Sequence, residues 1–304
     1  NVPVVCTVRD YWPVCYWSDL IHDRDADTLC PACSPGMMTR CVRPRAGVFW
    51  PLALPFIPYM HANLALKRRA LAAADAVVAV SSAIARDLRA RSPELDGTEV
   101  TIIPNPVDVT AIRAEAERQP CPLETPYALY LGKLEPNKGV HKLVAAIERA
   151  ELEWPLMIVG DGSERSRLEE ASRRSGRDVR FIGWLPREEA LGWLLHAEIL
   201  VFPSHGPESL SRVLLEASAL GRPIAAIDTG GTGDIITHEV TGLLSRTAEG
   251  LGDNLARLRR DEGLRCRLGL AAKRKVEETF ESSGVIRRIE MLYATLIEQG
   301  RRED

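Results

Sequence analysis

Short apolar runs alternate with helical segments from Pro126 onward, and this alternation limits the possible folds more than any other feature. The runs expected to be buried strands are YALYLGKL, PLMIVG, VRFIG, ILVFPS, PIAAIDT and GLLS. Segments between them, such as GVHKLVAAIERA and PREEALGWLLHA, have the helical spacing of apolar residues. Strands joined by helices in this way form a parallel sheet covered on both faces, so the sequence predicts an α/β fold.

The 304 residues are enough for two domains, and we expect a Pro-bounded linker over residues 104–122. The predicted regions are a partial N-terminal domain at 1–107, a second domain at 108–281 and a C-terminal segment at 282–304 with a helix over 282–299. The chain starts at Asn1 and runs directly into the apolar strand VPVVCTV, so we expect the first domain to be incomplete. Within that domain, residues 11–45 are expected to be loop-like and residues 59–73 helical.

The net charge of −3 argues against a general nucleic-acid binder, so no nucleic-acid partner is expected. The local charge is different, because no Asp or Glu occurs from Thr28 to Ala74. Six basic residues do occur there: Arg40, Arg43, Arg45, Lys67, Arg68 and Arg69. The apolar, aromatic run between them is too short and too rich in proline to span a membrane. Two interpretations of residues 40–69 stay open: core residues beside solvated charges, or peripheral contact with an anionic membrane surface.

Seven cysteines, an odd number in a chain large enough to have a core, favour a reduced, cytoplasmic setting. Four of them cluster in the sequence: Cys15, Cys30, Cys33 and Cys41. The Cys30-x2-Cys33 spacing is typical of zinc knuckles, and Cys15 and Cys41 could complete a tetrahedral zinc site. The alternative is a loop that contains buried or free thiols.

Four polar segments follow predicted strands: GKLEPNKG, GDGSE, PSHGPES and TGGTGD. Ligands of open α/β sheets bind outside the carboxyl ends of the strands, so these segments predict a site. Lys133 and Lys138 lie at a strand-to-helix turn, where two ammonium groups suit a phosphate or diphosphate. The segment VGDGSE has no third glycine in dinucleotide register, which makes a nicotinamide-dependent oxidoreductase the less favoured enzyme class.

The segment ESLSRVLLE has two interpretations that the local sequence leaves open. Glu208 could be a favourable charge at a helix start, with Arg212 and Glu216 as an i, i+4 pair. Alternatively, Glu208 and the N–H groups of residues 209–211 face the ligand edge, and Glu216 lies one to two turns further along. His205, in the preceding loop, either polarises a substrate hydroxyl or is only solvated.

Taken in order, several motifs resemble the donor domain of glycosyltransferase family 4, and the resemblance runs from about residue 75 to the C-terminus. They are IIPNPVD, LYLGKLEPNKGVHKLVAAI, IVGDGSERSRLEE, VRFIGWL, VFPSHGPESLSRVLLEASALGRPIAAIDTGGTGDII and TGLL. The resemblance implies the GT-B fold, which is two Rossmann-like domains with parallel sheets facing a cleft. It also implies metal-independent, retaining hexosyl transfer in cell-envelope or polysaccharide biosynthesis. The donor would be a UDP-, GDP- or ADP-sugar and the acceptor a glycan, a lipid-linked molecule or a small molecule.

The same resemblance assigns roles to individual residues. Glu208 would contact the donor sugar, and Lys133 and Lys138 would contact its diphosphate, so these three are the catalytic candidates. The other expected donor-binding residues are Ser209, Leu210, Ser211, Glu216, Gly132 and Gly231. In the segment VRDYWPVC, Arg9 precedes Asp10 where the family usually has a His, so these two residues are further candidates. This departure and the incomplete first domain make a catalytically impaired donor-binding homologue the alternative.

Overall fold

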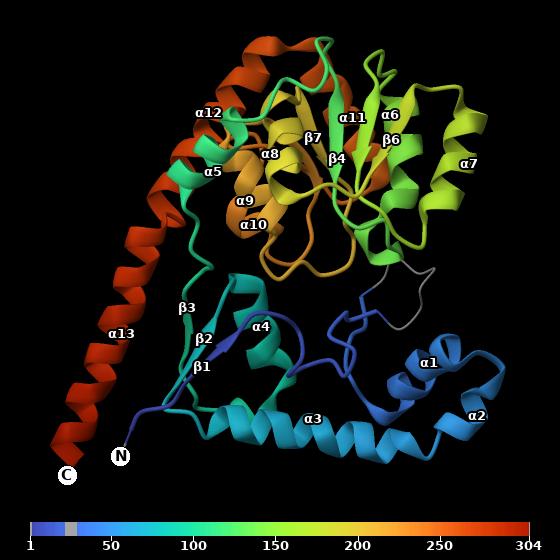
Figure 1. The fold of residues 1–304 in the computed structure, drawn as a ribbon. Coiled ribbons are helices and arrows are strands. Elements are labelled where there is room, and N and C mark those ends of the chain that lie inside the picture. The colour runs from blue at the N-terminus through green and yellow to red at the C-terminus, as the bar shows by residue number, and fades with distance from the viewer. Residues whose placement is uncertain (1, 22–28, 304) are drawn as a thin grey trace. The chain divides into compact units, whose positions relative to one another are not determined.

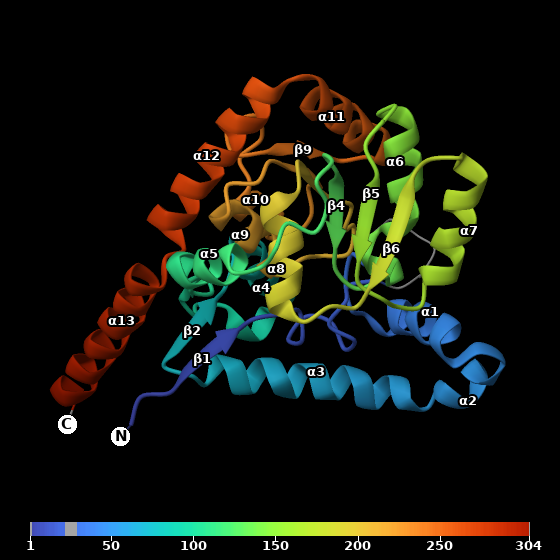
Figure 2. The ribbon, with the colours of Figure 1, turned by 45° about the horizontal axis from the view of Figure 1, so that its top comes forward.

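A computed structural model of the protein describes residues 2–21 and 29–303. The chain divides into two compact units (Figures 1 and 2). The first runs to Asn105 and is completed by the C-terminal residues from Val285, and the second runs from Pro106 to Gly284. Both units contain parallel sheets with helices, as the α/β prediction requires. Among the described residues, no helix is both long enough and apolar enough to cross a membrane.

The second unit is built on a six-stranded sheet whose spatial order is β6-β5-β4-β7-β8-β9. All neighbouring strands in it are parallel. Its strands are β4 (Ala128–Leu131), β5 (Leu156–Val159), β6 (Val179–Gly183), β7 (Ile199–Phe202), β8 (Ile224–Ile227) and β9 (Leu243–Ser245). β5, β7 and β8 are buried along their whole length, which explains why their sequences are continuous apolar runs.

Helices cover both faces of this sheet. The helices are α5 (Val109–Glu117), α6 (Leu143–Arg149), α7 (Arg165–Ser175), α8 (Arg187–His196), α9 (Arg212–Ala219), α10 (Thr232–Ile235), α11 (Ala248–Arg260) and α12 (Glu262–Thr279). Helices α6, α7 and α11 pack together over one face, where their apolar residues join those of the strands in one core. Helices α5, α8 and α9 contact one another, and α12 contacts α9. Two short 3-10 helices, η3 (Pro136–Lys138) and η4 (Val140–Lys142), precede α6.

The first unit has a three-stranded parallel sheet in the order β1-β2-β3. Its elements are β1 (Val5–Val8), α1 (Pro35–Ala46), η1 (Gly47–Phe49), α2 (Trp50–Ala53), α3 (Phe56–Ala72), β2 (Ala76–Ala79), α4 (Ser82–Arg91), η2 (Pro93–Leu95), β3 (Val100–Ile102) and α13 (Ser282–Glu303). Val285 of α13 is buried against Val78 and Ile103, which groups the C-terminal helix with this unit.

Three helices differ from the expectations. α1 lies inside the segment expected to be loop-like, and it begins where the Ser34 hydroxyl accepts a hydrogen bond from the Met37 N–H. α5 lies inside the expected linker, and the Asp108 carboxylate caps it by accepting from the Ala111 N–H. α12 occupies residues for which no helix was expected, and Asp261 caps it in the same way. In each case a capping side chain starts the helix, and for α1 and α5 it does so in a segment that was expected to be irregular.

Candidate active site

A pocket of about 500 Å³ opens at the carboxyl ends of β4 and β7. These two strands are neighbours in the sheet, but the chain proceeds from β4 outward to β5 and β6 before β7 returns to the other side of β4. The strand order therefore reverses between β4 and β7, and crevices at such reversals are where open α/β sheets bind ligands. We call it the switch-point pocket. Its lining comprises Tyr130, Leu131, Gly132, Lys133, Glu135, Asn137, Lys138, Phe202, Ser204, Glu208, Leu210, Ser211, Arg212 and Val213.

Glu208 holds a mostly buried carboxylate on the wall of this pocket. Its Oε1 lies 2.5 Å from the Lys138 Nζ and accepts a hydrogen bond of 2.7 Å from the Ser204 hydroxyl. Because the Glu208 side chain is only 12% exposed, this cation and this donor compensate a charge that water cannot reach well. Lys138 and Glu208 are 70 residues apart in the sequence, so the fold and not local spacing unites them.

The glycine loop after β8 supports Glu208 through the backbone. The Gly231 N–H donates to the Glu208 carbonyl oxygen over 2.6 Å. Gly230 has a φ of +51°, and a Cβ at this position would lie 2.1 Å from the same oxygen. Gly231 is buried and does not line the switch-point pocket. The loop predicted to approach a ligand therefore packs against the backbone of the residue that faces the pocket.

The loop before Glu208 is held equally closely. The Gly206 N–H donates to the Asn137 carbonyl oxygen, and the Thr229 hydroxyl donates to the carbonyl oxygens of His205 and Gly206. Gly139 adopts a φ of +65°, and a Cβ there would lie 2.0 Å from the Pro203 carbonyl oxygen. These contacts fix the two loops that carry Lys138 and Glu208 against each other.

Helix α9 begins later than the sequence suggested. It starts at Arg212, and the Ser211 hydroxyl caps it by accepting from the Leu214 N–H. The N–H groups of residues 209–211 are therefore not those of the first helical turn, which corrects that expectation. Leu210 and Ser211 line the switch-point pocket, whereas Ser209 does not. The first turn of α9 brings Arg212 to the pocket instead, as a third cation beside Lys133 and Lys138.

Glu216 is buried one turn beyond the pocket lining and pairs with an unexpected residue. Its Oε1 accepts from the Arg187 Nε over 3.1 Å, and Arg187 also pairs with Glu115. The predicted i, i+4 partner, Arg212, makes no such ion pair among the interactions of the described residues. Burial raises the pKa of Glu216, and the positive charge of Arg187 opposes this shift. Arg187 thus helps to keep a buried carboxylate ionised.

Two further residues of β4 and its following turn shape the pocket. Gly132 has a φ of +154°, and a Cβ there would lie 3.2 Å from the Tyr130 hydroxyl oxygen. The Tyr130 hydroxyl donates to the Lys133 carbonyl oxygen over 2.7 Å. Burial, followed by the negative charge of Glu208, raises the pKa of Tyr130, so it remains a neutral donor. Tyr130, Arg187 and Arg212 were missed because a strand tyrosine and helix-surface arginines carry no local signal of a site.

The remaining candidates are not part of the lining of this pocket. His205 is buried, with its ring edge-to-face against His141 at a centroid distance of 5.5 Å, and it does not line the switch-point pocket. Arg9 and Asp10 lie in the first unit after β1, where the Asp10 carboxylate accepts from the Trp12 N–H. Roles for these two residues stay predictions.

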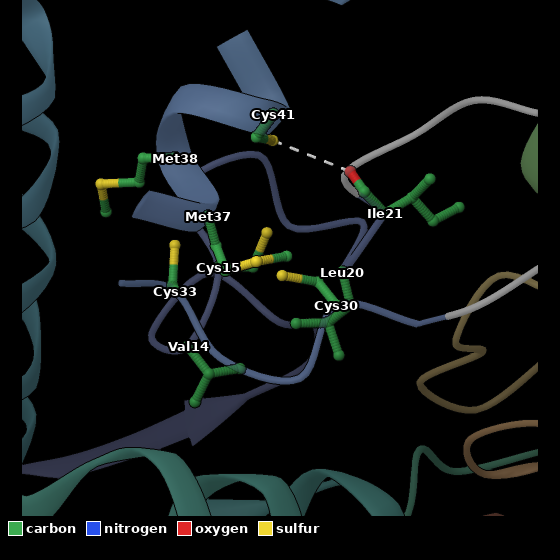
Figure 3. A pocket seen from close by; sticks show the side chains of 9 residues that line it. All are labelled: Val14, Cys15, Leu20, Ile21, Cys30, Cys33, Met37, Met38 and Cys41. Atoms are coloured by element: carbon green, nitrogen blue, oxygen red, sulfur yellow. Dashed lines mark hydrogen bonds between the residues drawn. The ribbon is translucent and has the colours of Figure 1, made fainter. Parts of the chain in front are cut away.

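The clustered cysteines line a second, much smaller pocket of about 10 Å³ in the first unit, which we call the cysteine pocket (Figure 3). Its lining is Cys15, Cys30, Cys33 and Cys41 with the apolar residues Val14, Leu20, Ile21, Met37 and Met38. The Cys30 thiol donates to the Ala32 carbonyl oxygen, and the Cys41 thiol is directed at the Ile21 carbonyl oxygen (Figure 3).

The state of the thiols and the placement of possible ligands bear on the zinc hypothesis. Burial raises the pKa of Cys30 and Cys33, and raises that of Cys41 to about 12. Within residues 2–21 and 29–303, no three His, Cys, Asp or Glu side chains are placed to hold a metal ion. The structure places the four cysteines together in one apolar pocket, and zinc binding there stays a prediction.

Comparison with known proteins covers both units. Residues 112–275, more than half of the chain, match the family Glycosyl transferases group 1, and residues 1–111 match Glycosyltransferase Family 4. D-inositol 3-phosphate glycosyltransferase of Xylanimonas cellulosilytica is 31% identical over 71% of this chain and 56% of its own length. O-antigen chain mannosyltransferase C of Escherichia coli is 29% identical over 77% of this chain and 64% of its own length.

A solved structure extends the comparison to nearly the whole chain. HepE of Anabaena, in complex with UDP and glucose, is 18% identical, with a TM-score of 0.68 over 96% of this chain and 71% of that one. This likeness shows a GT-B fold. The chain spans about half the length of the first curated relatives that it matches. On the family matches and the 31% identity, the chain belongs to the group 1 glycosyltransferases, with a first unit of the family 4 type.

Proposed function

We propose that the protein transfers a hexose from a nucleotide-sugar donor to a glycan, a lipid-linked molecule or a small-molecule acceptor, with retention of the anomeric configuration and without a metal ion. One observation carries the proposal: three cationic side chains and a buried carboxylate surround one pocket at the switch point of the second unit. The cations are Lys133, Lys138 and Arg212, and the carboxylate is Glu208. This combination suits a ligand with an anionic diphosphate and a polyhydroxylated sugar.

The chemistry follows from where charge develops. As the sugar–oxygen bond breaks, negative charge builds on the leaving diphosphate, and fixed cations and N–H dipoles stabilise that charge in the transition state. Lys133, Lys138, Arg212 and the first turn of α9 would supply this stabilisation, which a divalent ion supplies in other enzymes. Leu210 and Ser211 would contribute backbone contacts to the same group.

The two carboxylates would take different hydroxyl groups. Glu208 is oriented by Lys138 and Ser204, so it is prepared to accept a hydrogen bond from the donor sugar. Glu216, whose Oε1 accepts from Arg187, would accept from the ribose. Gly132 and Gly231 would act through the backbone, the first at the pocket and the second by holding Glu208.

The proposed setting is the cytoplasm, because all seven cysteines are free thiols. Relatives that act on cell-envelope glycans, such as the O-antigen mannosyltransferase, support a role in cell-envelope or polysaccharide synthesis. A lipid-linked acceptor would bring the enzyme to the inner face of a membrane, with residues 40–69 as the contacting segment.

A thermal-shift screen with UDP-, GDP- and ADP-sugars tests donor binding, since ligand binding to the native state raises the melting temperature. One donor class should raise the melting temperature of the wild type, and the double variant Lys133→Ala/Lys138→Ala should lose the response. Arg113→Ala, which removes an exposed charge elsewhere in the second unit, should keep it. The proposal fails if no nucleotide sugar stabilises the wild type, or if NAD alone does.

A second candidate is a donor-binding homologue with impaired catalysis, which the Arg9 substitution for the usual family histidine favours. Assay of transfer and of donor hydrolysis separates the two functions. Donor binding with turnover, and NMR of the product showing a retained anomer, supports the transferase. Donor binding with neither reaction supports the impaired homologue.

A further inference from the structure

The helices α2 and α3 of the first unit expose an unusual number of large apolar side chains. Leu52 is 73% exposed and Phe56 63% exposed. The full exposed set from η1 to α3 is Val48, Phe49, Leu52, Phe56, Tyr59 and Leu66. Figures 1 and 2 show this segment as the α1–α2 turn and the long helix α3 that follows it. Large apolar side chains that gather on an exposed segment indicate an interaction site.

The exposed side chains form a stripe separate from the side of α3 that packs on the core. Phe56, Tyr59 and Leu66 follow helical spacing along α3, with Asn63 between the last two, in steps of three and four residues. The core-facing residues of α3 are Ile57, Met60, Leu64 and Leu71, and the first three pack with α1. The exposed stripe therefore takes no part in packing the core.

The charge around this stripe has one sign. Arg40, Arg43 and Arg69 are exposed and Lys67 is half-buried, while no Asp or Glu occurs from residue 29 to residue 74. The Arg43 guanidinium lies 5.7 Å from the centroid of the Trp50 ring, which brings a positive charge to the turn that exposes Phe49. The other two of the six basic residues form ion pairs and are not counted in this surface. Arg45 pairs with Asp19 and Arg68 with Glu94.

We propose that this basic apolar surface, defined by the six exposed apolar residues with Arg40, Arg43, Lys67 and Arg69, docks on a bilayer that contains anionic lipids. Apolar and aromatic side chains enter the interfacial region while the basic groups meet acidic headgroups. Trp50 and Tyr59 have the amphipathic rings that favour this depth. A second copy of the chain fits less well, because a self-complementary contact would bring like charges together.

Vesicle flotation tests this surface independently of any transferase activity. The wild-type chain is floated with vesicles of phosphatidylcholine and with vesicles of phosphatidylcholine mixed with phosphatidylglycerol. We expect binding to the mixed vesicles only, and weaker binding at higher salt. Phe49→Ser/Phe56→Ser and Arg40→Gln/Arg43→Gln should each lower the partition coefficient by roughly tenfold or more. Circular dichroism checks that both variants are folded.

Two double variants of second-unit residues serve as matched controls for the surface variants. Trp184→Ser/Leu270→Ser removes exposed apolar residues, and Arg173→Gln/Arg174→Gln removes exposed charges. Both should bind the mixed vesicles as the wild type does. The proposal is overturned if the wild type does not float with mixed vesicles, binds both vesicle types equally, or loses no binding in the surface variants. It is also overturned if sedimentation without lipid shows a dimer that these variants dissociate, because the occupant is then a second copy.

Discussion

The switch-point pocket and the cysteine pocket both collect chemically versatile side chains, but only the first arranges them for a charged ligand. In the switch-point pocket, Lys138 and Glu208 come from loops 70 residues apart and form an ion pair. In the cysteine pocket, residues that are close in sequence gather among apolar side chains, and burial raises the pKa of Cys30, Cys33 and Cys41. Position at a sheet edge thus brings charged side chains together, whereas clustering in the sequence here brings thiols together in an apolar pocket.

The substitution with the largest expected effect is Glu208→Gln. It keeps the side-chain shape but removes the charge that Lys138 and Ser204 orient. We expect transfer to fall by roughly 10² to 10³, the usual cost of one electrostatic group aligned with the transition state. Transfer rate and melting temperature are measured together, with Glu117→Gln as the control at an exposed carboxylate. If the Glu208→Gln enzyme transferred sugar at the wild-type rate, the proposed role of Glu208 would be wrong.

Gly230→Ala should have the next largest effect, because the added Cβ meets the Glu208 backbone at 2.1 Å in a left-handed conformation. We expect a loss of about 3 kcal/mol in the free energy of unfolding, together with lower donor affinity. Gly176→Ala is the matched control: its φ is +66°, but no atom lies within 4 Å of the added Cβ. It should cost only the backbone strain, about 1 kcal/mol. Equal losses in denaturant melts of the two variants would contradict the support role of Gly230.

Arg187→Gln tests whether Glu216 acts as a charged group. Without Arg187 the pKa of Glu216 rises further, because burial already raises it and the opposing charge is gone. If the ionised carboxylate binds ribose, donor affinity is lost as pH falls through this pKa, and in the variant the loss starts at a higher pH. Near neutral pH we expect an affinity loss of about fivefold, equivalent to one hydrogen bond. Calorimetric titration across pH measures both effects, and identical pH profiles would contradict the prediction.

The parts predicted correctly from sequence are those with strong local patterns. Continuous apolar runs identified β5, β7 and β8, and their loops identified Lys133, Lys138 and Glu208 as neighbours at one edge. The missed features depend on packing between elements. Arg187 meets Glu216 from 29 residues away, only because α8 contacts α9. Likewise, the role of Gly231 as a support for Glu208 depends on the path of the loop after β8, which no local pattern specifies.

The smallest expected effect concerns the cysteine pocket, where we expect no response to zinc. Added zinc, or treatment with a chelator, should leave the melting temperature unchanged, since no metal then links folding to ligand binding there. Thiol labelling supplies the positive readout: Cys121 and Cys266 are exposed and should react with iodoacetamide first. Cys30 and Cys41, buried and with raised pKa values, should react only on the timescale of local opening. Stabilisation by zinc, together with zinc protection of Cys30 and Cys41 from labelling, would instead make this pocket a metal site whose thiols rearrange on binding.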